Sequence, residues 1–306
     1  MSMVEDAQVL PVTPKAQQRG PRPASRLRLI FAKLARTPRF WVGTLTLLVI
    51  VLWALFGLAF YNFNAVSQDV MSMNTGPTGK HWFGTDEIGG DIYAQTVVGL
   101  RKSLLIGFVV GPVSALLAGF IGALAGYLGG VWDRVIVWFI DLLLVLPALY
   151  ILIMLYPLIK GGSWVIVMVY LAIFSWMILA RVIRAQTSSL RDRDFVKAAR
   201  FMGVKTSTII RRHIIPNVSS LLIIDATLGV GAAILTETTL SYFGFGVQPP
   251  DVSLGTLLSS GTGAATTRPW LFVFPAAILV ITVLATSLAG DALRDAVDPT
   301  SGANRD

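Results

Sequence analysis

Three carboxylates stand inside otherwise apolar stretches of this chain, and they have its clearest capacity for chemistry. They are Asp141, Asp225 and Glu237. A charged group in a hydrophobic segment is costly unless it has a partner, water or a role in moving a solute. One interpretation places them on a path through a membrane, where Asp141 or Asp225 meets an ammonium group. The alternative is structural, with hydrogen bonds between helices or exposure to water.

Catalytic and metal-binding patterns are not found in the sequence. There is no Cys, and the two His residues, His81 and His213, are too few for a histidine-rich metal cage. GPTGK at 76–80 lacks the spacing of a phosphate-binding loop, and neither HExxH nor GxSxG occurs. We therefore predict no catalytic residue, metal site or cofactor in this chain, so work must come from a partner or an ion gradient.

Residues 193–217, RDFVKAARFMGVKTSTIIRRHIIPN, form a basic stretch in an apolar chain. Four apolar residues recur at i, i+3, i+4 and i+7, which predicts a short helix with one apolar face. They are Phe195, Ala198, Ala199 and Met202. A small-faced helix held between two apolar segments suits docking onto another protein. The alternative is an ordinary amphipathic surface helix.

The sequence also marks where helices begin and end in this stretch. Gly203 is expected to end the first helix. Pro216 is expected in the first turn of a later helix, where proline loses no needed hydrogen bond. The residues expected to cap the two short helices are Asp192 or Asp194 and Thr206 or Ser207.

Composition indicates a membrane protein. The 306 residues are 54% hydrophobic and 14% charged, outside the usual balance of soluble domains. Six apolar stretches are long enough to cross a bilayer; they are about 41–61, 103–128, 135–158, 164–183, 217–242 and 269–290. We predict an all-α polytopic membrane protein with six transmembrane helices. Small residues spaced by four in the second stretch allow close helix approach; they are Ala118, Gly122, Gly126 and Gly130.

The distribution of Lys and Arg predicts the orientation. Twenty of them lie in the N-terminal tail, the 129–134 turn, the 181–216 loop and the C-terminal tail, and five lie on the opposite side. By the positive-inside rule both termini and the 193–217 loop are cytoplasmic. The net charge of +8 is therefore a signal of topology, and we predict no nucleic-acid partner.

The remaining segments are polar. Residues 1–40 form a basic, partly disordered tail, in which 26–39 either lies along the inner membrane surface or serves as a simple anchor. The outer segments 62–102 and 243–268 are not expected to fold as domains. Thr85 or Asp86 is expected to cap an outer helix over about 87–100.

The 193–217 loop resembles the cytoplasmic coupling loop of ABC-importer permeases. That pattern is Glu-Ala-Ala, three residues, Gly and then about a dozen residues to Pro. Ala198, Ala199, Gly203 and Pro216 match it, whereas Lys197 stands at the usual Glu position. Further segments resemble the C-type permease subunit of dipeptide and oligopeptide importers, so the resemblance covers nearly all of 81–299; these segments are 81–107, 180–195, 237–258 and 290–299.

The resemblance implies a bacterial cell-membrane complex with a second related permease, two ATPase subunits that bind ATP and Mg, and an extracytoplasmic binding protein. The 193–217 loop would take force from an ATPase. Dipeptide, oligopeptide, glutathione and nickel-chelate importers share the pattern. A self-sufficient secondary transporter and an intramembrane enzyme are the other classes considered. The expected division is a tail at 1–40, a first span and outer loop at 41–80, a permease domain at 81–299 and a tail at 300–306.

Overall fold

The computed structural model describes residues 26–155 and 164–297. The start of the predicted N-terminal tail, the end of the third predicted span and the C-terminal tail at 300–306 lie outside the described residues. Within the described ranges the protein is all-helical apart from two isolated β-bridges, which confirms the predicted class. The helices are α1 (Arg26–Ala35), α2 (Pro38–Phe56), η1 (Val70–Ser72), α3 (Ile92–Leu128), α4 (Gly130–Val145), α5 (Ala148–Leu155), α6 (Trp164–Ser175), α7 (Met177–Arg191), α8 (Asp194–Phe201), α9 (Thr206–Ile209), η3 (Ile210–Ile214), α10 (Ile215–Tyr242), α11 (Leu254–Thr262) and α12 (Trp270–Val297).

Five helical segments in the described part are long and apolar enough to cross a membrane. They are α2, α3, α6 with α7, α9 through α10, and α12. The third predicted span is present as two shorter helices, α4 and α5. Leu146 between them is extended because a residue that precedes a proline, here Pro147, avoids the helical conformation.

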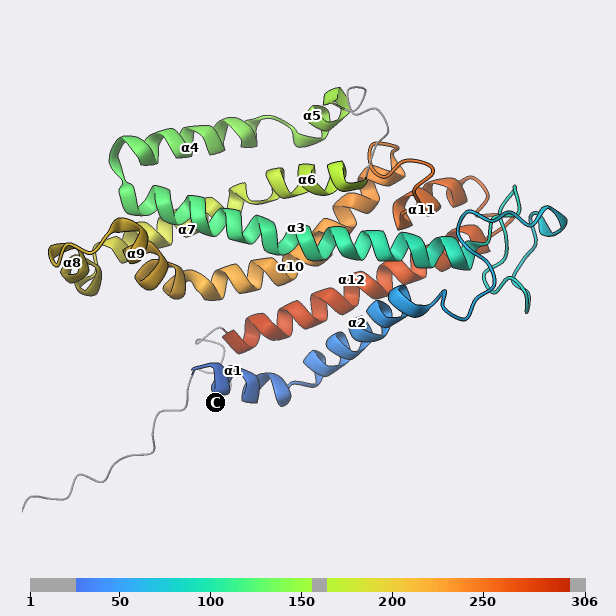
Figure 1. Ribbon diagram of the computed structural model, residues 1–306, viewed down its shortest axis with the longest axis horizontal. Helices are drawn as coiled ribbons and strands as arrows, with labels where there is room; N and C mark the ends of the chain where they lie inside the picture. The colour runs from blue at the N-terminus through green and yellow to red at the C-terminus, as the bar shows by residue number, and fades with distance from the viewer. Residues whose placement is uncertain (1–25, 156–163, 298–306) are drawn as a thin grey trace, which may run out of the picture.

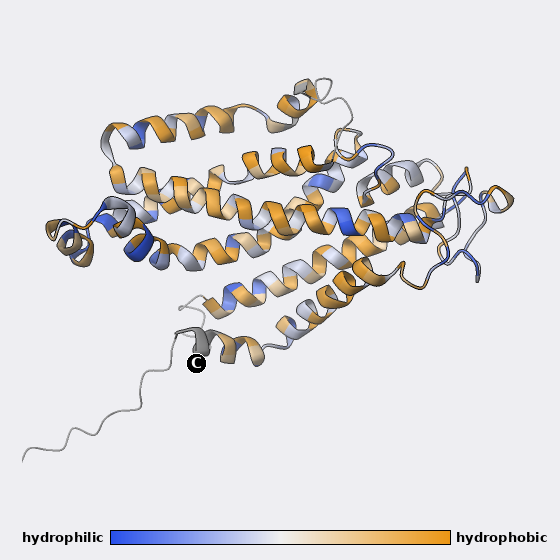
Figure 2. Ribbon diagram, viewed as in Figure 1, coloured by the Kyte–Doolittle hydropathy of each residue, from blue (hydrophilic) through white to orange (hydrophobic). Residues whose placement is uncertain are grey.

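Helix α3 runs through the middle of the bundle, packed against α7 and α10, while α2 lies along α12 (Figure 1). α1, the end of α12, α8 and α9 lie at one end of the bundle. The 62–91 loop and α11 lie at the other. Orange apolar helices separate the two more polar ends (Figure 2). The first described helix, the C-terminal end of α12 and the 193–217 loop therefore share one side, as the charge distribution predicts.

Two glycines of α3 let its backbone contact that of α7. A Cβ on Gly122 would lie 2.5 Å from the Ala180 carbonyl oxygen, and one on Gly126 would lie 2.5 Å from that of Arg184. The predicted close approach of small residues is therefore confirmed at these positions. It does not extend to Gly130, whose Cβ would meet no atom within 4 Å, because Gly130 has already left α3 and begins α4.

The short helix α1 is held by α12. Leu34 is buried in a cluster with Ala292 and Ala296 of α12, and the Lys33 ammonium donates to the Asp295 carbonyl oxygen. Both options considered for residues 26–39 placed them at the inner membrane surface. The packing shows a helix anchored on the end of the last span.

The expected outer helix over 87–100 is wrong in its start and its caps. The structure places the start of α3 at Ile92, where the Asp91 carboxylate accepts a hydrogen bond from the Ala94 amide at 2.8 Å. Asp86 instead closes a turn, because one of its carboxylate oxygens accepts from the amides of Ile88 and Gly90. The second span is thus continuous with the outer helix and begins eleven residues before the predicted start at 103.

The outer loop is organised around a buried histidine. The His81 ring lies between two carboxylates, with Nδ1 2.7 Å from Asp91 Oδ2 and Nε2 3.3 Å from Asp69 Oδ2. The Tyr61 hydroxyl donates to Asp91 at 2.6 Å, and Lys80 pairs with Asp69 at 2.5 Å. Because Asp91 also caps α3, this polar cluster ties residues 61–91 to the start of that helix.

The pH dependence of this loop is set in part by Asp69. The hydrogen bond from Lys80 holds the pKa of Asp69 at about 2, below its ordinary 3.8, with further hydrogen bonds from His81 and Ser72. A depressed carboxylate pKa contributes stability above the ordinary value that is lost as pH falls through the folded value. We expect amide-exchange protection over 69–90 to persist at pH 4 and to fall as pH approaches 2.

The Lys80→Met variant should lose this protection nearer to pH 4, because the main cause of the pKa depression is removed. Hydrogen exchange followed by mass spectrometry on the wild type and the variant, each from pH 7 to pH 2, measures the difference. Identical pH profiles for the two proteins would show that Lys80 does not set the titration.

Candidate functional site

Helix α8 is seated on the bundle by two residues and leaves the rest of its apolar side chains exposed. Val196 and Ala199 are buried, Ala199 with 2% of its surface exposed, in a cluster with Ile209 and Ile214. The four residues predicted to share a face are therefore divided. Ala199 faces the body of the protein, whereas Phe195, Ala198 and Met202 lie on the outer side.

Phe201 is the member of this outer surface that the spacing argument missed. Its side chain is 91% exposed, and Met202 beside it is 75% exposed. Large apolar side chains gathered on a short exposed helix indicate a surface used for protein contact. The signal was present in the sequence, because Phe201 ends the helix three residues after Ala198.

The N-terminal caps expected for this loop are wrong. Arg193 occupies the N-cap of α8 and makes no side-chain cap, and Asp194 is already inside the first turn. Lys205 takes the corresponding place before α9, so neither Thr206 nor Ser207 caps that helix. Asp194 still favours the helix, because a carboxylate in the first turn complements the positive end of the helix dipole.

Gly203 ends α8, as predicted. Its φ is +73°, a left-handed conformation that glycine adopts without steric cost. The Val204 amide donates to the Ala199 carbonyl and the Gly203 amide to that of Arg200, at 3.2 and 3.0 Å. This pair of hydrogen bonds is the Schellman motif. It turns the chain back toward the bundle immediately after the exposed Phe201 and Met202.

Pro216 lies in the first turn of α10, as predicted, and α10 continues the second half of the loop without a break. α9 passes through a π-helical turn, Ile210–Ile214, directly into α10. The Ile215 amide donates to the Ile210 carbonyl, one residue further back than in an α-helix. A π turn before a proline absorbs its missing hydrogen bond, which is why Pro216 does not interrupt the helix.

The three intramembrane carboxylates have different surroundings. Asp141 of α4 forms an ion pair with Arg181 of α7. Glu237 of α10 is fully buried, and it accepts hydrogen bonds from the hydroxyls of Ser103 and Ser241, each at 2.7 Å. Asp225 of α10 is half-buried, and no hydrogen bond or ion pair joins it to another described residue.

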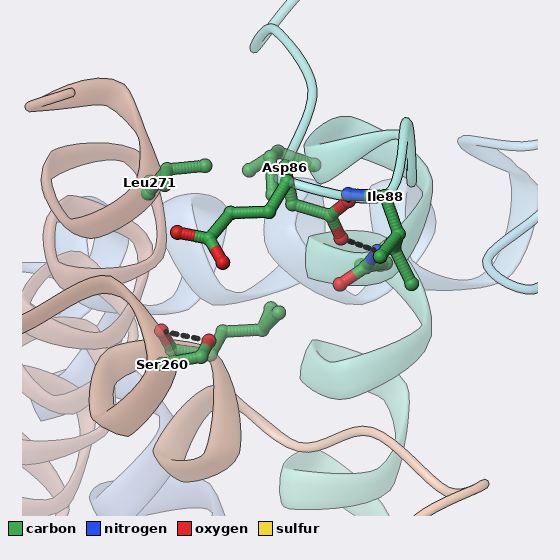
Figure 3. A pocket seen from close by; sticks show the side chains of 8 residues that line it. Asp86, Ile88, Ser260 and Leu271 are labelled. Carbon is green, nitrogen blue, oxygen red and sulfur yellow. Dashed lines mark hydrogen bonds between the residues drawn. The ribbon is translucent and has the colours of Figure 1, made fainter. Parts of the chain in front are cut away.

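Two hollows on the described surface lie near the spans. A groove of about 450 Å³ between α5, α6 and α10 is lined in part by Tyr170, Ser175, Thr236 and Thr239. A second hollow of about 270 Å³ lies at the opposite end from the 193–217 loop. Asp86 and Ile88 of the outer loop, Ser260 of α11 and Leu271 of α12 are among the residues that line it (Figure 3).

Comparison with known proteins places this architecture in a family. The family described as "Binding-protein-dependent transport system inner membrane component" matches residues 118–301, more than half of the chain. This chain belongs to that family. It is an ABC-importer permease of the C type, a multi-pass membrane protein and a transport subunit, as the sequence analysis predicted.

Relatives of this permease extend the match toward its N-terminus. The chain is 46% identical over 282 residues to the oligopeptide transport system permease protein OppC of Mycobacterium tuberculosis (H37Rv), covering 91% of this chain and 96% of that one. It is 35% identical to OppC of Bacillus subtilis over 84% of each chain. It is 42% identical to a putative peptide permease of Brucella suis over 77% of this chain and 78% of that one.

A substitution at the position where the permease departs from the family pattern tests the electrostatics of the loop. Lys197 is exposed in the middle of α8. We expect Lys197→Glu to keep uptake within about twofold of the wild type, since dipole effects on an exposed side chain are about 0.3–1 kcal/mol. Uptake by membrane vesicles that contain the whole transporter measures this. Loss of uptake would show that Lys197 has an acidic partner of its own.

Proposed function

We propose that this permease is one of two related membrane subunits of an ATP-driven importer of oligopeptides, with two ATPase subunits on the inner side and a binding protein on the outer side. The family and the names of its relatives, which are oligopeptide or peptide permeases, support the peptide substrate. The family implies ATPase and binding-protein partners. In this proposal both termini and the 193–217 loop are cytoplasmic, and ATP and Mg are bound by the ATPase subunits alone.

The observation that carries the mechanism is the form of the 193–217 loop. α8 presents Phe195, Phe201 and Met202 outward, while Val196 and Ala199 hold it against the bundle. Its far end continues without a break into a spanning helix of 37 residues, Thr206–Tyr242. A push on the exposed surface of α8 is therefore delivered to α10. ATPase closure would tilt this helix and switch the permease between inward- and outward-facing states.

The outer end has features that suit a docking protein. The 62–91 loop is tied to α3 through Asp91. It is also tied to Arg268, two residues before α12, whose guanidinium donates to Glu87 at 2.7 Å. The hollow of about 270 Å³ lies between this loop, α3, α11 and α12 (Figure 3). A protein bound there contacts segments that lead directly into three helices of the bundle.

Reconstitution tests this proposal. Vesicles that contain both permeases, the ATPases and the binding protein should accumulate a labelled oligopeptide only with ATP. Vesicles with this chain alone should accumulate nothing, with or without ATP. Glutathione and a nickel chelate serve as competing substrates. Accumulation by the lone chain, or uptake of glutathione or the nickel chelate by the full complex without any uptake of peptide, would contradict the proposal.

A further inference from the structure

One face of α10 carries a polar stripe through the membrane-spanning part of the permease. Asp225, Ala232, Thr236 and Thr239 follow one another at intervals of seven, four and three residues. At 3.6 residues per turn these positions lie one above another. All four are exposed or half-exposed. The stripe therefore forms an accessible surface along about four turns of the helix.

Other faces of α10 are occupied by neighbours. Toward α3, a Cβ on Gly111 would lie 2.7 Å from the Ala226 carbonyl oxygen. Toward α12, a Cβ on Gly290 would lie 2.7 Å from Leu228 and 3.6 Å from Thr227. The stripe lies between these two contact faces. They come closest to it at Leu228 and Gly229, in the turn between Asp225 and Ala232, but its own four residues stay accessible.

The hydroxyls of the stripe have free acceptor capacity. Thr236 and Thr239 each donate to the backbone carbonyl four residues earlier, at 2.8 Å. Each hydroxyl oxygen keeps lone pairs for an incoming donor. Both threonines open onto the groove of about 450 Å³ beside α6, where Ser175 adds a further hydroxyl. The part of the stripe formed by Thr236 and Thr239 is thus a polar surface that lines the groove.

Asp225 sets the charge of the stripe. Of the three intramembrane carboxylates, Asp141 pairs with Arg181 and Glu237 is held by two serines. Asp225 has no such partner among the described residues. A carboxylate on an open face of a spanning helix cannot face hydrocarbon without a large cost, so the face must meet water or a cationic group.

We propose that this stripe lines the path of the peptide, and that the Asp225 carboxylate binds a cationic group of the peptide as it passes. The cationic group is the N-terminal ammonium or a basic side chain, which share the same chemistry. This inference rests on the proposed function. The threonine hydroxyls contact the peptide backbone in the groove, and Asp225 receives the charged group about 16 Å further along the helix, at 1.5 Å per residue.

Cysteine labelling tests whether the stripe faces water. The chain contains no Cys, so a single introduced thiol reports on its own position. In the assembled transporter, Ala232→Cys should react faster with a cationic thiol reagent than with an anionic one, by about threefold at low salt, where charges about 10 Å apart still interact. Adding Asp225→Asn should remove this preference. An unreactive thiol, or a preference that persists without Asp225, overturns the proposal.

Uptake assays test the role of Asp225 in transport. Asp225→Asn should lower uptake of a lysine-containing peptide with a free N-terminus by about fivefold, the upper range for a partly solvated ion pair. Asp225→Glu should restore most of the rate, and Asp225→Lys should abolish uptake. A lysine-containing and a glutamate-containing peptide of the same length separate the two sources of positive charge. If only the lysine peptide loses rate, the basic side chain is the group recognised.

Matched threonines provide the control. Thr227 and Thr236 each donate to the backbone carbonyl four residues earlier in the same helix, but only Thr236 lies on the stripe. Thr236→Val should lower uptake, whereas Thr227→Val should not. Equal effects of the two, or failure of Asp225→Asn to co-purify with the second permease, would show a structural or subunit-contact role. If wild-type vesicles take up no peptide, the proposed function fails, while labelling still reports on the path.

Discussion

The Ala199→Arg variant is expected to abolish peptide uptake and to release α8 from the body of the permease. Ala199 is 2% exposed and packs within the cluster that includes Val196 and Ile209. An arginine there must either bury an unpaired charge, at a cost of several kcal/mol, or lift the helix outward. Either result disconnects the exposed surface of α8 from α10. ATP-dependent uptake and the melting temperature of the purified transporter measure the two effects.

The adjacent Ala198→Arg variant is the control for this prediction. Ala198 lies on the same helix but faces outward. Its replacement should leave the melting temperature unchanged, because no buried group is displaced. It should still lower ATP-dependent uptake by weakening binding of the ATPase, because charge and bulk are placed on the proposed docking surface. Normal uptake by Ala198→Arg would exclude that surface as the ATPase contact. An unchanged melting temperature for Ala199→Arg would contradict the seating of α8.

The Gly126→Val variant is expected to prevent stable folding of the permease. A Cβ at this position would lie 2.5 Å from the Arg184 carbonyl oxygen and 2.8 Å from the Thr187 Cβ. The nearest atom is backbone, so the clash is relieved only by separating α3 from α7. Overpacking a core typically costs about 1–3 kcal/mol, and a backbone displacement places this change at or above that range. The amount of permease in the membrane and its melting temperature should both fall.

Gly263→Val is the matched comparison. A Cβ on Gly263 would meet no atom within 4 Å, and its backbone is not left-handed. We expect this variant to accumulate and melt like the wild type. Equal losses for Gly126→Val and Gly263→Val would show that the defect comes from losing any glycine. In that case the close contact between α3 and α7 would not be its cause.

The sequence predicted the helices well because membrane spans depend on a simple requirement for length and hydropathy. The starts and ends of helices depend on local competition that the sequence states less clearly. At the start of α3, Thr85, Asp86 and Asp91 are all suitable caps. Only the packing of the outer loop around His81 decides in favour of Asp91. The first-turn position of Pro216 was predicted correctly, but spacing gave no sign of the π turn that joins α9 to α10 without a break.

The 193–217 loop shows a similar limit. Spacing correctly identified the helix and its glycine end, but it could not tell which apolar residues face the body. The answer depends on where α7 and the π turn place α8. Both Ala198 and Ala199 fit a small-residue face, and only the tertiary packing buries the second of them. Asp141, Asp225 and Glu237 likewise differ in their surroundings because their neighbours come from other helices. The sequence of one span does not show which helices these are.

The contact between Gly111 and Gly229 has a mechanical consequence. A Cβ on Gly229 would lie 3.3 Å from the Gly111 Cα, so the rod from Thr206 to Tyr242 crosses α3 with little side-chain bulk between them. If this rigid helix rocks about the crossing, it acts as a lever with two arms. Its inner arm is about 35 Å long and its outer arm about 20 Å, at 1.5 Å per residue. In the proposed importer, a shift of the inner tip would therefore become a smaller, opposite shift at the outer tip, which would link opening at one surface to closing at the other.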